Sequence, residues 1–522
     1  MNCEREINAF AHSYSLKETA SYLSLAGPDI HPNRTEIGGV VIRRKSFGIL
    51  LVMAFVTMAA GAKAQSAQGT TASSQSNGSS GAPAPSGGSY SGSVPTQAVP
   101  GVLPLSLQDA IDRGLKQNLG LLLSSSDVNS AAGQRWQQLA TILPHLSAAP
   151  YVQVSQVDLA EFGFSFSGPG FTVPTIVGPF SYFDARANLS DSVFDWSAIN
   201  NTHAATERLS AARHTYQDAR DLVVLAVGYA YLQTIASEAR VDTAQAQVDT
   251  AQALYNQAAD QVSAGTSPQI DELRAQVELK TRQQQLIAAK NDVEIQKLSL
   301  ARTIGFAPGQ QFNLTDRSPY SPFEGMTVDE ALKRAYASRS DFQADMADVR
   351  AAEYAKRAAE AERYPTLSVT ADYGVAGQHP STNSHGVFDF RGTLNIPIFQ
   401  GGRVRGDEAV ADAQLQQSRD RLENLRGQID ADVRTALLNI QSAQDQVNVA
   451  QSNIALAQQT LSQARDRFAA GVTNTVEVVQ AEEAVASANE NYISSLYSYN
   501  YAKISLARAL GMAESGVKEF FK

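Results

Sequence analysis

Two stretches of the chain repeat apolar residues with the spacing of a coiled coil. Steps of three and four residues alternate from Val241 to Val262, and the same pattern returns from Val447 to Phe468 at a constant shift of 206 residues. The matching positions are Val241, Ala244, Val248, Ala251, Tyr255, Ala258 and Val262, then Val447, Ala450, Ile454, Ala457, Leu461, Ala464 and Phe468. Chance amphipathicity would not reproduce the same positions twice, so the pattern predicts two coiled-coil seams in one register.

The two seams lie in proline-free stretches that predict very long helices. One runs from Ser197 to Val262 and the other from Arg403 to Phe468. At 1.5 Å per residue each helix would be about 100 Å long, far longer than the helices of a globular core. These helices are therefore expected to form an elongated wall.

Each long helix is expected to end at a tight turn. Gly265 and Gly471 follow the seams and suit the left-handed position after a helix C-terminus. In the first turn, Ser267 is predicted to cap the next helix, with Pro268 as its first residue. A shorter helix is expected to return from each turn along part of the long helix.

The whole pattern occurs twice along the chain. Each copy is interpreted as a helix, two strands, a long helix, a tight turn and a shorter helix. Ser106 and Thr327 are predicted to cap the opening helices, which are interpreted as unbroken to near Ala140 and Glu362. The shift between the copies falls from 221 to 206 residues within the strand region. This change predicts a longer loop in the first copy, at residues 168–179.

The segments between these helices alternate apolar and polar residues, as half-buried strands do. The clearest alternation runs from Val387 to Phe399, its partner from Leu367 to Val375, and the first copy has similar segments at 183–190 and, less cleanly, 146–157. Such segments are typical of an outer-membrane barrel, although a soluble sheet with one polar face has the same period. Four strands cannot close a barrel, and open edges cannot face lipid, so a membrane barrel would have to be an oligomer.

Composition narrows the class of protein. The chain has 522 residues, 18% of them charged, with a formal net charge of -10 and no basic stripe, so no nucleic-acid partner is expected. Cys3 is the only cysteine, which excludes a disulfide framework. The Glu482-Glu483 pair is interpreted as part of a solvated helix. Because no phosphate-binding loop, nucleophile motif or zinc spacing occurs, we expect no catalytic residues, no metal and no cofactor.

An export signal precedes the repeats. The basic cluster at 43–45 is followed by an apolar run from Phe47 to Ala60 and by Ala62-Lys63-Ala64, which predicts a secretory signal cleaved after Ala64. The run is too short to be a spanning anchor. The predicted boundaries are 1–64 for the N-terminal extension and signal peptide, 65–101 for a disordered linker, 102–312 for the first repeat, 313–514 for the second, and 515–522 for a C-terminal tail.

Several short motifs resemble those of the TolC-like outer membrane factor family. They are the Leu-Ser-Leu-x-x-Ala-Ile opening at Leu105, echoed at Met326, the Pro-Ile-Phe-x-Gly-Gly-Arg run ending at Arg403, and the Ala-Gly-Val-Thr turn from Ala470. The resemblance covers about residues 103–513. It implies a mostly α fold with β, in which a tandem repeat forms a homotrimer. The trimer would be a 12-stranded outer-membrane β-barrel continuous with a periplasmic α-helical coiled-coil barrel.

The resemblance also implies a function and partners. It implies a passive outer-membrane exit duct of a tripartite efflux system, in which a periplasmic adaptor joins the duct to an inner-membrane pump. A type I protein-secretion duct would have the same sequence features, so the cargo stays open at this point. The alternative of a different class is a non-channel coiled-coil scaffold of the periplasm, which predicts no membrane insertion and no strand pairing.

Two groups of site residues follow from the resemblance. The family's adaptor-facing tip falls on Gly265, Thr266, Ser267, Gly471, Val472 and Thr473. Family members often narrow the closed periplasmic mouth with an acid six residues after the tip glycine, here Asp271 and Glu477. A second acid three residues later is replaced by Arg274 and Gln480, which departs from the best-known double ring. Helix capping is the alternative role for both acids, since a first helical turn favours negative charge.

Overall fold

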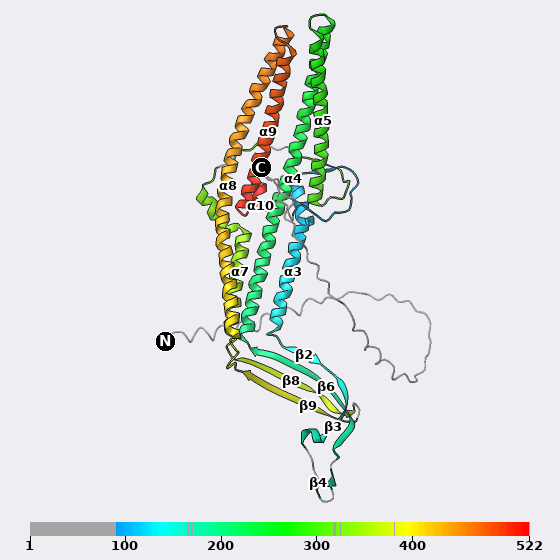
Figure 1. The fold of residues 1–522 in the computed structure, drawn as a ribbon, viewed down its shortest axis with the longest axis vertical. Helices are drawn as coiled ribbons and strands as arrows, with labels where there is room; N and C mark the ends of the chain where they lie inside the picture. The colour runs from blue at the N-terminus through cyan, green and yellow to red at the C-terminus, as the bar shows by residue number, and fades with distance from the viewer. Residues whose placement is uncertain are drawn as a thin grey trace, which may run out of the picture. The chain divides into compact units, whose positions relative to one another are not determined.

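The computed structural model describes residues 90–163, 167–168, 171–172, 174–316, 320–323, 325–379 and 382–520. The predicted signal peptide and cleavage site, and the linker up to residue 89, lie outside these residues. Residues 82–522 form one compact unit, so the two repeats share a fold rather than forming separate domains (Figure 1).

Both copies contain the predicted elements in the predicted order. The first copy comprises β1 (Leu103–Leu105), α2 (Leu107–Gln117), α3 (Leu119–Ala140), β2 (His145–Ala148), β3 (Tyr151–Asp158), the 3-10 helix η1 (Leu159–Phe162), β4 (Ser167–Gly168), β5 (Phe171–Thr172), β6 (Ile176–Phe194), α4 (Trp196–Ser263) and α5 (Gln269–Ile304). The second comprises β7 (Phe312–Leu314), α6 (Val328–Ser338), α7 (Ser340–Ala361), β8 (Thr366–His379), β9 (Thr382–Asn395), α8 (Arg403–Ala469), α9 (Thr475–Ala509) and α10 (Ala513–Phe520). The predicted C-terminal tail is therefore largely helical.

The long helices are confirmed almost to the residue. Helix α4 has 68 residues and α8 has 67, and each begins and ends within a residue of its prediction. None of the seam positions in α4 or α8 is exposed, and those of α8 are the more deeply buried. Helix α4 is the one described helix that is long and apolar enough to span a membrane, but half of its apolar window is buried by packing.

The prediction of unbroken opening helices is wrong in both copies. The capping boxes at Ser106 and Thr327 are confirmed, but the helices stop at Asn118 and Arg339, whose backbones are extended with ψ of 127° and 119°. These two residues are 221 positions apart, so the break is a feature of the repeat. In the first copy the Asn118 side chain accepts from the Gly120 N–H, which caps the following helix.

The disorder predicted for residues 65–101 does not hold for their last part. The Val94 N–H donates to the Gln117 carbonyl at 2.9 Å, and the Thr96 N–H donates to the Gly305 carbonyl at 2.9 Å. These carbonyls lie at the ends of α2 and α5, where a helix leaves acceptors unpaired. Residues 90–101 are therefore tied to the ends of two helices.

The long helices lie side by side as a wall with two open edges. Near the sheet the order is α3, α4, α7, α8; toward the turns it is α5, α4, α9, α8 (Figure 1). Helix α4 is central and packs on α3, α5, α7 and α9. Among the described residues, α8 packs on α7, α9 and the short helix α6, and α3 and α5 pack on α4 and the short helix α2, so no further long helix flanks either end of the row.

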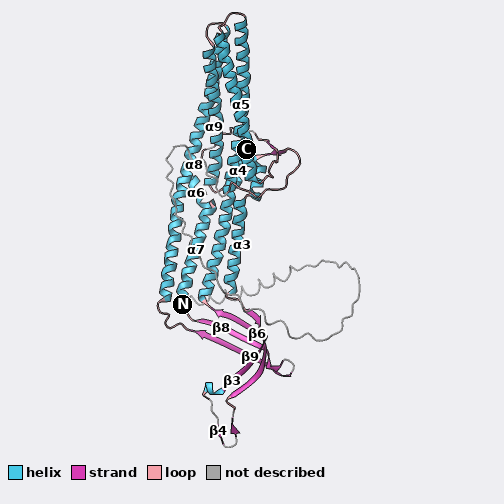
Figure 2. Ribbon diagram, turned by 45° about the vertical axis from the view of Figure 1, so that its right-hand side comes forward, coloured by secondary structure: helices cyan, strands magenta, loops and turns pink. Residues whose placement is uncertain are grey.

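One antiparallel sheet lies at one end of the helices, as Figure 2 shows in magenta. The strand order is β2 and β3 together, then β6, β8 and β9, so the sheet has four strand positions and two open edges. The strand predicted to reach Phe399 ends at Asn395, because Pro397 cannot donate to a ladder. The predicted first-copy loop is also partly wrong, since Gly178 and Pro179 lie inside β6, opposite β3.

Candidate functional site

The two turns between the long and returning helices have the same backbone. Gly265 and Gly471 adopt the predicted left-handed conformation, with φ of 75° and 70°. In each turn the glycine N–H donates to the carbonyl three residues back and the next N–H to the carbonyl five back, the hydrogen bonds of a Schellman motif. The next residues, Thr266 and Val472, are exposed. The predicted tip residues are thus presented at the end of each hairpin.

The predicted N-cap at Ser267 is wrong. Helix α5 begins at Gln269, and Pro268 occupies the capping position with an extended ψ of 149° and no side-chain cap. The Ser267 hydroxyl instead donates to the Asp271 carboxylate at 2.9 Å. In the second hairpin Asn474 is the cap and accepts from the Val476 N–H, while the Thr473 hydroxyl donates to Glu477. Both turns thus have a hydrogen bond from a hydroxyl to the acid four residues later.

Asp271 and Glu477, the predicted constriction, have different surroundings. Asp271 is 6% exposed, and besides Ser267 it accepts from the Thr475 hydroxyl at 2.7 Å, with Arg274 at 3.6 Å. Thr475 belongs to the other hairpin, so Asp271 joins the two hairpins within one chain. Glu477 is paired instead with Arg467 of its own hairpin at 3.2 Å. Both acids lie in a first helical turn.

Each hairpin also has an ion pair of buried or half-buried side chains behind its turn. Arg282 donates to Glu278 at 2.5 Å, and Arg465 pairs with Glu482 at 3.4 Å. Glu482 is 5% exposed, so the prediction that it lies on a solvated face is wrong; burial raises its pKa. Its neighbour Arg282 helps line a cavity of about 360 Å³ between the hairpins. The sequence gave no sign that these charged side chains are buried, since charged residues on a helix usually face solvent.

A second ionic cluster, also missed by the sequence interpretation, lies at the break between α6 and α7. The Arg339 side chain is 4% exposed and pairs with Asp341 at 2.6 Å and Asp432 at 3.0 Å. Nearby, Arg508 of α9 donates to Asp218 of α4 at 2.5 Å. Burial raises the pKa of Asp218 to about 6.

The sheet has one apolar face and one polar face. Phe388 and Phe390 of β9 are 79% and 71% exposed, and they share their face with Tyr373 of β8. On the opposite face Arg186 of β6 lies between two carboxylates, Asp184 at 2.9 Å and Asp372 at 3.1 Å. A face of exposed aromatic residues backed by paired charges is suited to lipid on one side and water on the other.

No group of three His, Cys, Asp or Glu side chains that could hold a metal ion occurs among the described residues. The site is therefore one of surfaces and edges: two exposed turns, acids beside them, an apolar sheet face, and edges left open in both the sheet and the helical wall.

A family model matches most of the chain. A family model described as outer membrane efflux protein matches residues 111–306 and 331–512. Over 157 residues the chain is 31% identical to the cation efflux system protein CusC of Escherichia coli, covering 30% of this chain and 34% of that protein. The chain thus matches about a third of that relative's length.

Longer matches have lower identity. The chain is 23% identical over 431 residues to the outer membrane protein OprJ of Pseudomonas aeruginosa, covering 78% of this chain and 85% of that protein. A crystal structure of CusC superposes with a TM-score of 0.66 at 22% identity, covering 78% of this chain and 92% of that one. The latter likeness shows that the two chains share a fold.

Proposed function

The chain belongs to the outer membrane efflux protein family, and from this premise we propose that it is the outer-membrane exit duct of a tripartite efflux system. The duct is passive and conducts substrates from a pump and an adaptor to the exterior. The observation that carries the proposal is that sheet and helical wall are open on the same two sides of the chain.

The open edges support a ring of identical chains. Within one chain the first repeat meets the second through β6 against β8 and through α4 against α7 and α9. Applied once more, the same contacts place β9 against β2 and β3 of the next copy, and α8 against its α3 and α5. Three copies would supply twelve strand positions, enough for a closed barrel without edges.

The surfaces match the proposed location. The exposed Phe388 and Phe390 face lipid, and the paired charges around Arg186 face the aqueous lumen. Export with signal cleavage after Ala64 delivers the chain to the periplasm. A non-channel scaffold gives no reason for an exposed aromatic sheet face.

The turns are the proposed contact with a periplasmic adaptor, which in turn joins an inner-membrane pump. Thr266 and Val472 are exposed at the ends of the hairpins, where a partner protein could reach them. Asp271 and Glu477 are the proposed constriction at the periplasmic mouth. In this proposal Glu477, which is the more exposed, faces the channel and favours cations, whereas Asp271 holds the two hairpins together.

The test is conductance of the purified mature chain in planar lipid bilayers, with the mass of the assembly measured by native mass spectrometry. We expect trimers that conduct and a Glu477→Gln variant with lower cation selectivity. A monomeric, non-conducting chain would refute the duct. To separate efflux from type I protein secretion, the chain is crosslinked in cells through cysteines at Thr266 and Val472, and the captured adaptor is identified.

A further inference from the structure

A cavity of about 360 Å³ lies behind the turns, between the hairpin of α4 and α5 and the hairpin of α8 and α9. All four of these helices contribute residues to its lining. A volume of this size falls within the range of small-molecule pockets. The exposed residue Asp242 belongs to the lining, so the cavity reaches the surface and a ligand can enter it from solvent.

Two buried charges of opposite sign line the cavity, one from each hairpin. Arg282 of α5 is 7% exposed, and Glu482 of α9 is 5% exposed. Each is paired within its own hairpin: Arg282 donates to Glu278 at 2.5 Å, and Glu482 lies 3.4 Å from Arg465. The cavity therefore lies between a cation and a carboxylate from different hairpins.

The pairing of Glu482 is the weaker of the two. Its distance of 3.4 Å from Arg465 exceeds the roughly 2.7–2.9 Å of a good charge-assisted hydrogen bond, and the Arg465 side chain is 43% exposed. Burial raises the pKa of Glu482 more than Arg465 lowers it. Glu482 is therefore a buried carboxylate whose charge is only partly compensated, and such a group favours a further cation.

The fold does not require charge at these positions. At the 206-residue shift, Arg282 corresponds to Ala488, and Glu482 corresponds to Gln276. The same pair of long and returning helices thus forms with neutral residues at the equivalent position of each charge. The two charges are a property of the cavity rather than of the hairpin plan.

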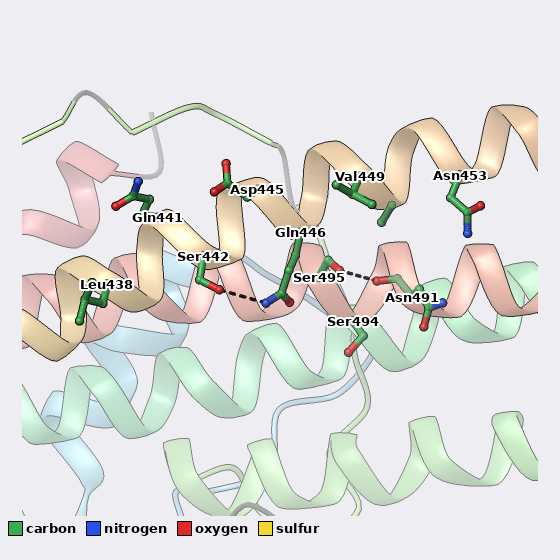
Figure 3. A pocket seen from close by; sticks show the side chains of 11 residues that line it. Leu438, Gln441, Ser442, Asp445, Gln446, Val449, Asn453, Asn491, Ser494 and Ser495 are labelled. Carbon is green, nitrogen blue, oxygen red and sulfur yellow. Dashed lines mark hydrogen bonds between the residues drawn. The ribbon is translucent and has the colours of Figure 1, made fainter.

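A larger groove between α8 and α9 lacks this feature. Its volume is about 740 Å³, and its charged lining residue, Asp445, is exposed (Figure 3). Most of its polar side chains are exposed amides and hydroxyls, such as Gln446, whose amide donates to Ser442 of the same helix at 3.2 Å. Volume alone does not distinguish a ligand site, whereas buried charges that face a cavity do.

We propose that the cavity between the hairpins binds a small organic amine, with its ammonium group on the Glu482 carboxylate and an oxygen acceptor at its other end beside Arg282. The amide of Asn489 is a neutral partner, and Leu461 and Val485 would contact the alkyl carbons. The bound amine would touch α5 and α9 together and so join the two hairpins. This inference goes beyond the proposed duct, because the site lies within a single chain.

A pair of probes that differ in one group tests the assignment. The purified mature chain in detergent micelles is titrated with 4-aminobutan-1-ol and, separately, with butane-1,4-diol, and binding is followed by ligand-observed NMR. We expect the amine to bind at least about tenfold more tightly than the diol, because only the amine carries a charge for the buried carboxylate. Equal affinities, or no binding of the amine, would overturn the proposal.

Variants locate the site. Glu482→Gln removes the charge with little change of shape and should weaken binding of the amine by at least about tenfold. Glu483→Gln is the matched control, since Glu483 is adjacent but exposed, and it should bind as the wild type does. Val485→Phe fills the cavity while keeping every charge and should also weaken binding. Equal affinities for the two glutamine variants, or full binding by Val485→Phe, would overturn the site.

Hydrogen exchange tests the bridge between the hairpins and separates this site from the duct. The amine should slow exchange of both turns, around Gly265 and Gly471, in the wild type but not in Glu482→Gln. Exchange that the amine leaves unchanged in the wild type would overturn the bridge. None of these measurements needs conduction, so a chain that binds the amine but does not conduct would refute the duct and support this site.

Discussion

The two copies of the repeat share a backbone plan but stabilise the same helix break with different chemistry. In the first copy the break is held by Asn118, a neutral residue that is 0% exposed, accepts from Gly120 and donates to the Tyr90 carbonyl. In the second copy Arg339 takes its place and is paired with Asp341 and Asp432. One break thus depends on neutral hydrogen bonds and the other on buried charge.

The turns show a related difference. The contact between hydroxyl and acid occurs in both, but only Asp271 also accepts from the opposite hairpin, through Thr475. The residue at the Thr475 position in the first copy is Gln269. A duplicated unit thus becomes two specialised units once each has a different neighbour, and substitutions at equivalent positions are a direct way to test this.

The largest effect is expected at the charged break. Arg339→Ala leaves two carboxylates without their buried partner and is expected to lower the free energy of unfolding by about 3–5 kcal/mol. The measurement is the midpoint of thermal denaturation, followed by circular dichroism in detergent. Arg334→Ala, at an exposed position of α6, is the control. Equal midpoints for the two variants would show that the ion pairs do not hold the break.

The next effect is a pH dependence at Asp218, in the first copy. Because burial raises the pKa of Asp218 to about 6, the stabilisation tied to its protonated form is complete below about pH 4 and is lost as the pH rises through about 6. Over that window the change amounts to about 3 kcal/mol per chain. Asp218→Asn should make the profile of denaturation midpoint against pH less steep.

The control for this pH profile is the equivalent position of the second copy, Asn424, which is exposed. Asn424→Asp should leave the profile as it is in the wild type. A profile of the same steepness in Asp218→Asn would mean that another group titrates.

A smaller effect is expected at the turns. Thr475→Val keeps the shape of the side chain but removes the hydroxyl that Asp271 binds, and it is expected to cost about 1.5–3 kcal/mol. Thr473→Val removes the partner of the less buried Glu477 and should cost about 1 kcal/mol or less. Hydrogen exchange of the two turns, measured by mass spectrometry, would rank them. Faster exchange in Thr473→Val than in Thr475→Val would contradict the prediction that the Asp271 contact is the stronger one.

The smallest effect is expected at the neutral break. Asn118→Ala removes a cap and should cost about 1 kcal/mol, well below the cost of Arg339→Ala. The denaturation midpoint is again the measurement, and Asn129→Ala at an exposed position of α3 is the control. A loss as large as that of Arg339→Ala would mean that the two breaks are equivalent after all.

Much of the fold was predictable because it follows from local periodicity. The seams from Val241 and Val447 determine α4 and α8, and the glycines at 265 and 471 determine the turns. The breaks at Asn118 and Arg339 were not predictable, since both residues are acceptable inside a helix and the pattern continues past them. Their extended backbone depends on neighbours that are distant in sequence, such as Asp432.

The candidate site was predictable to a lesser degree. The turns at 265 and 471 follow from the turn chemistry and are confirmed by their hydrogen bonds, whereas the adaptor contact that the resemblance implies for them stays a prediction. The burial of Asp271 and Glu482 depends on which hairpin packs beside which, and no spacing within the sequence reports that. A pair of adjacent glutamates in one helix predicts a solvent-exposed face, and Glu482 is buried only because another hairpin packs against it.

The unequal strands have a consequence for the outer rim of the assembly. Strand β6 has 19 residues and is paired with β3 over its outer part, whereas β8 and β9 have 14 each. If three chains form the proposed ring, the longer hairpin of β3 and β6 alternates with the shorter hairpin of β8 and β9, and the rim would carry three projections. An antibody that recognised the projecting hairpin of such a ring would then have three equivalent binding sites.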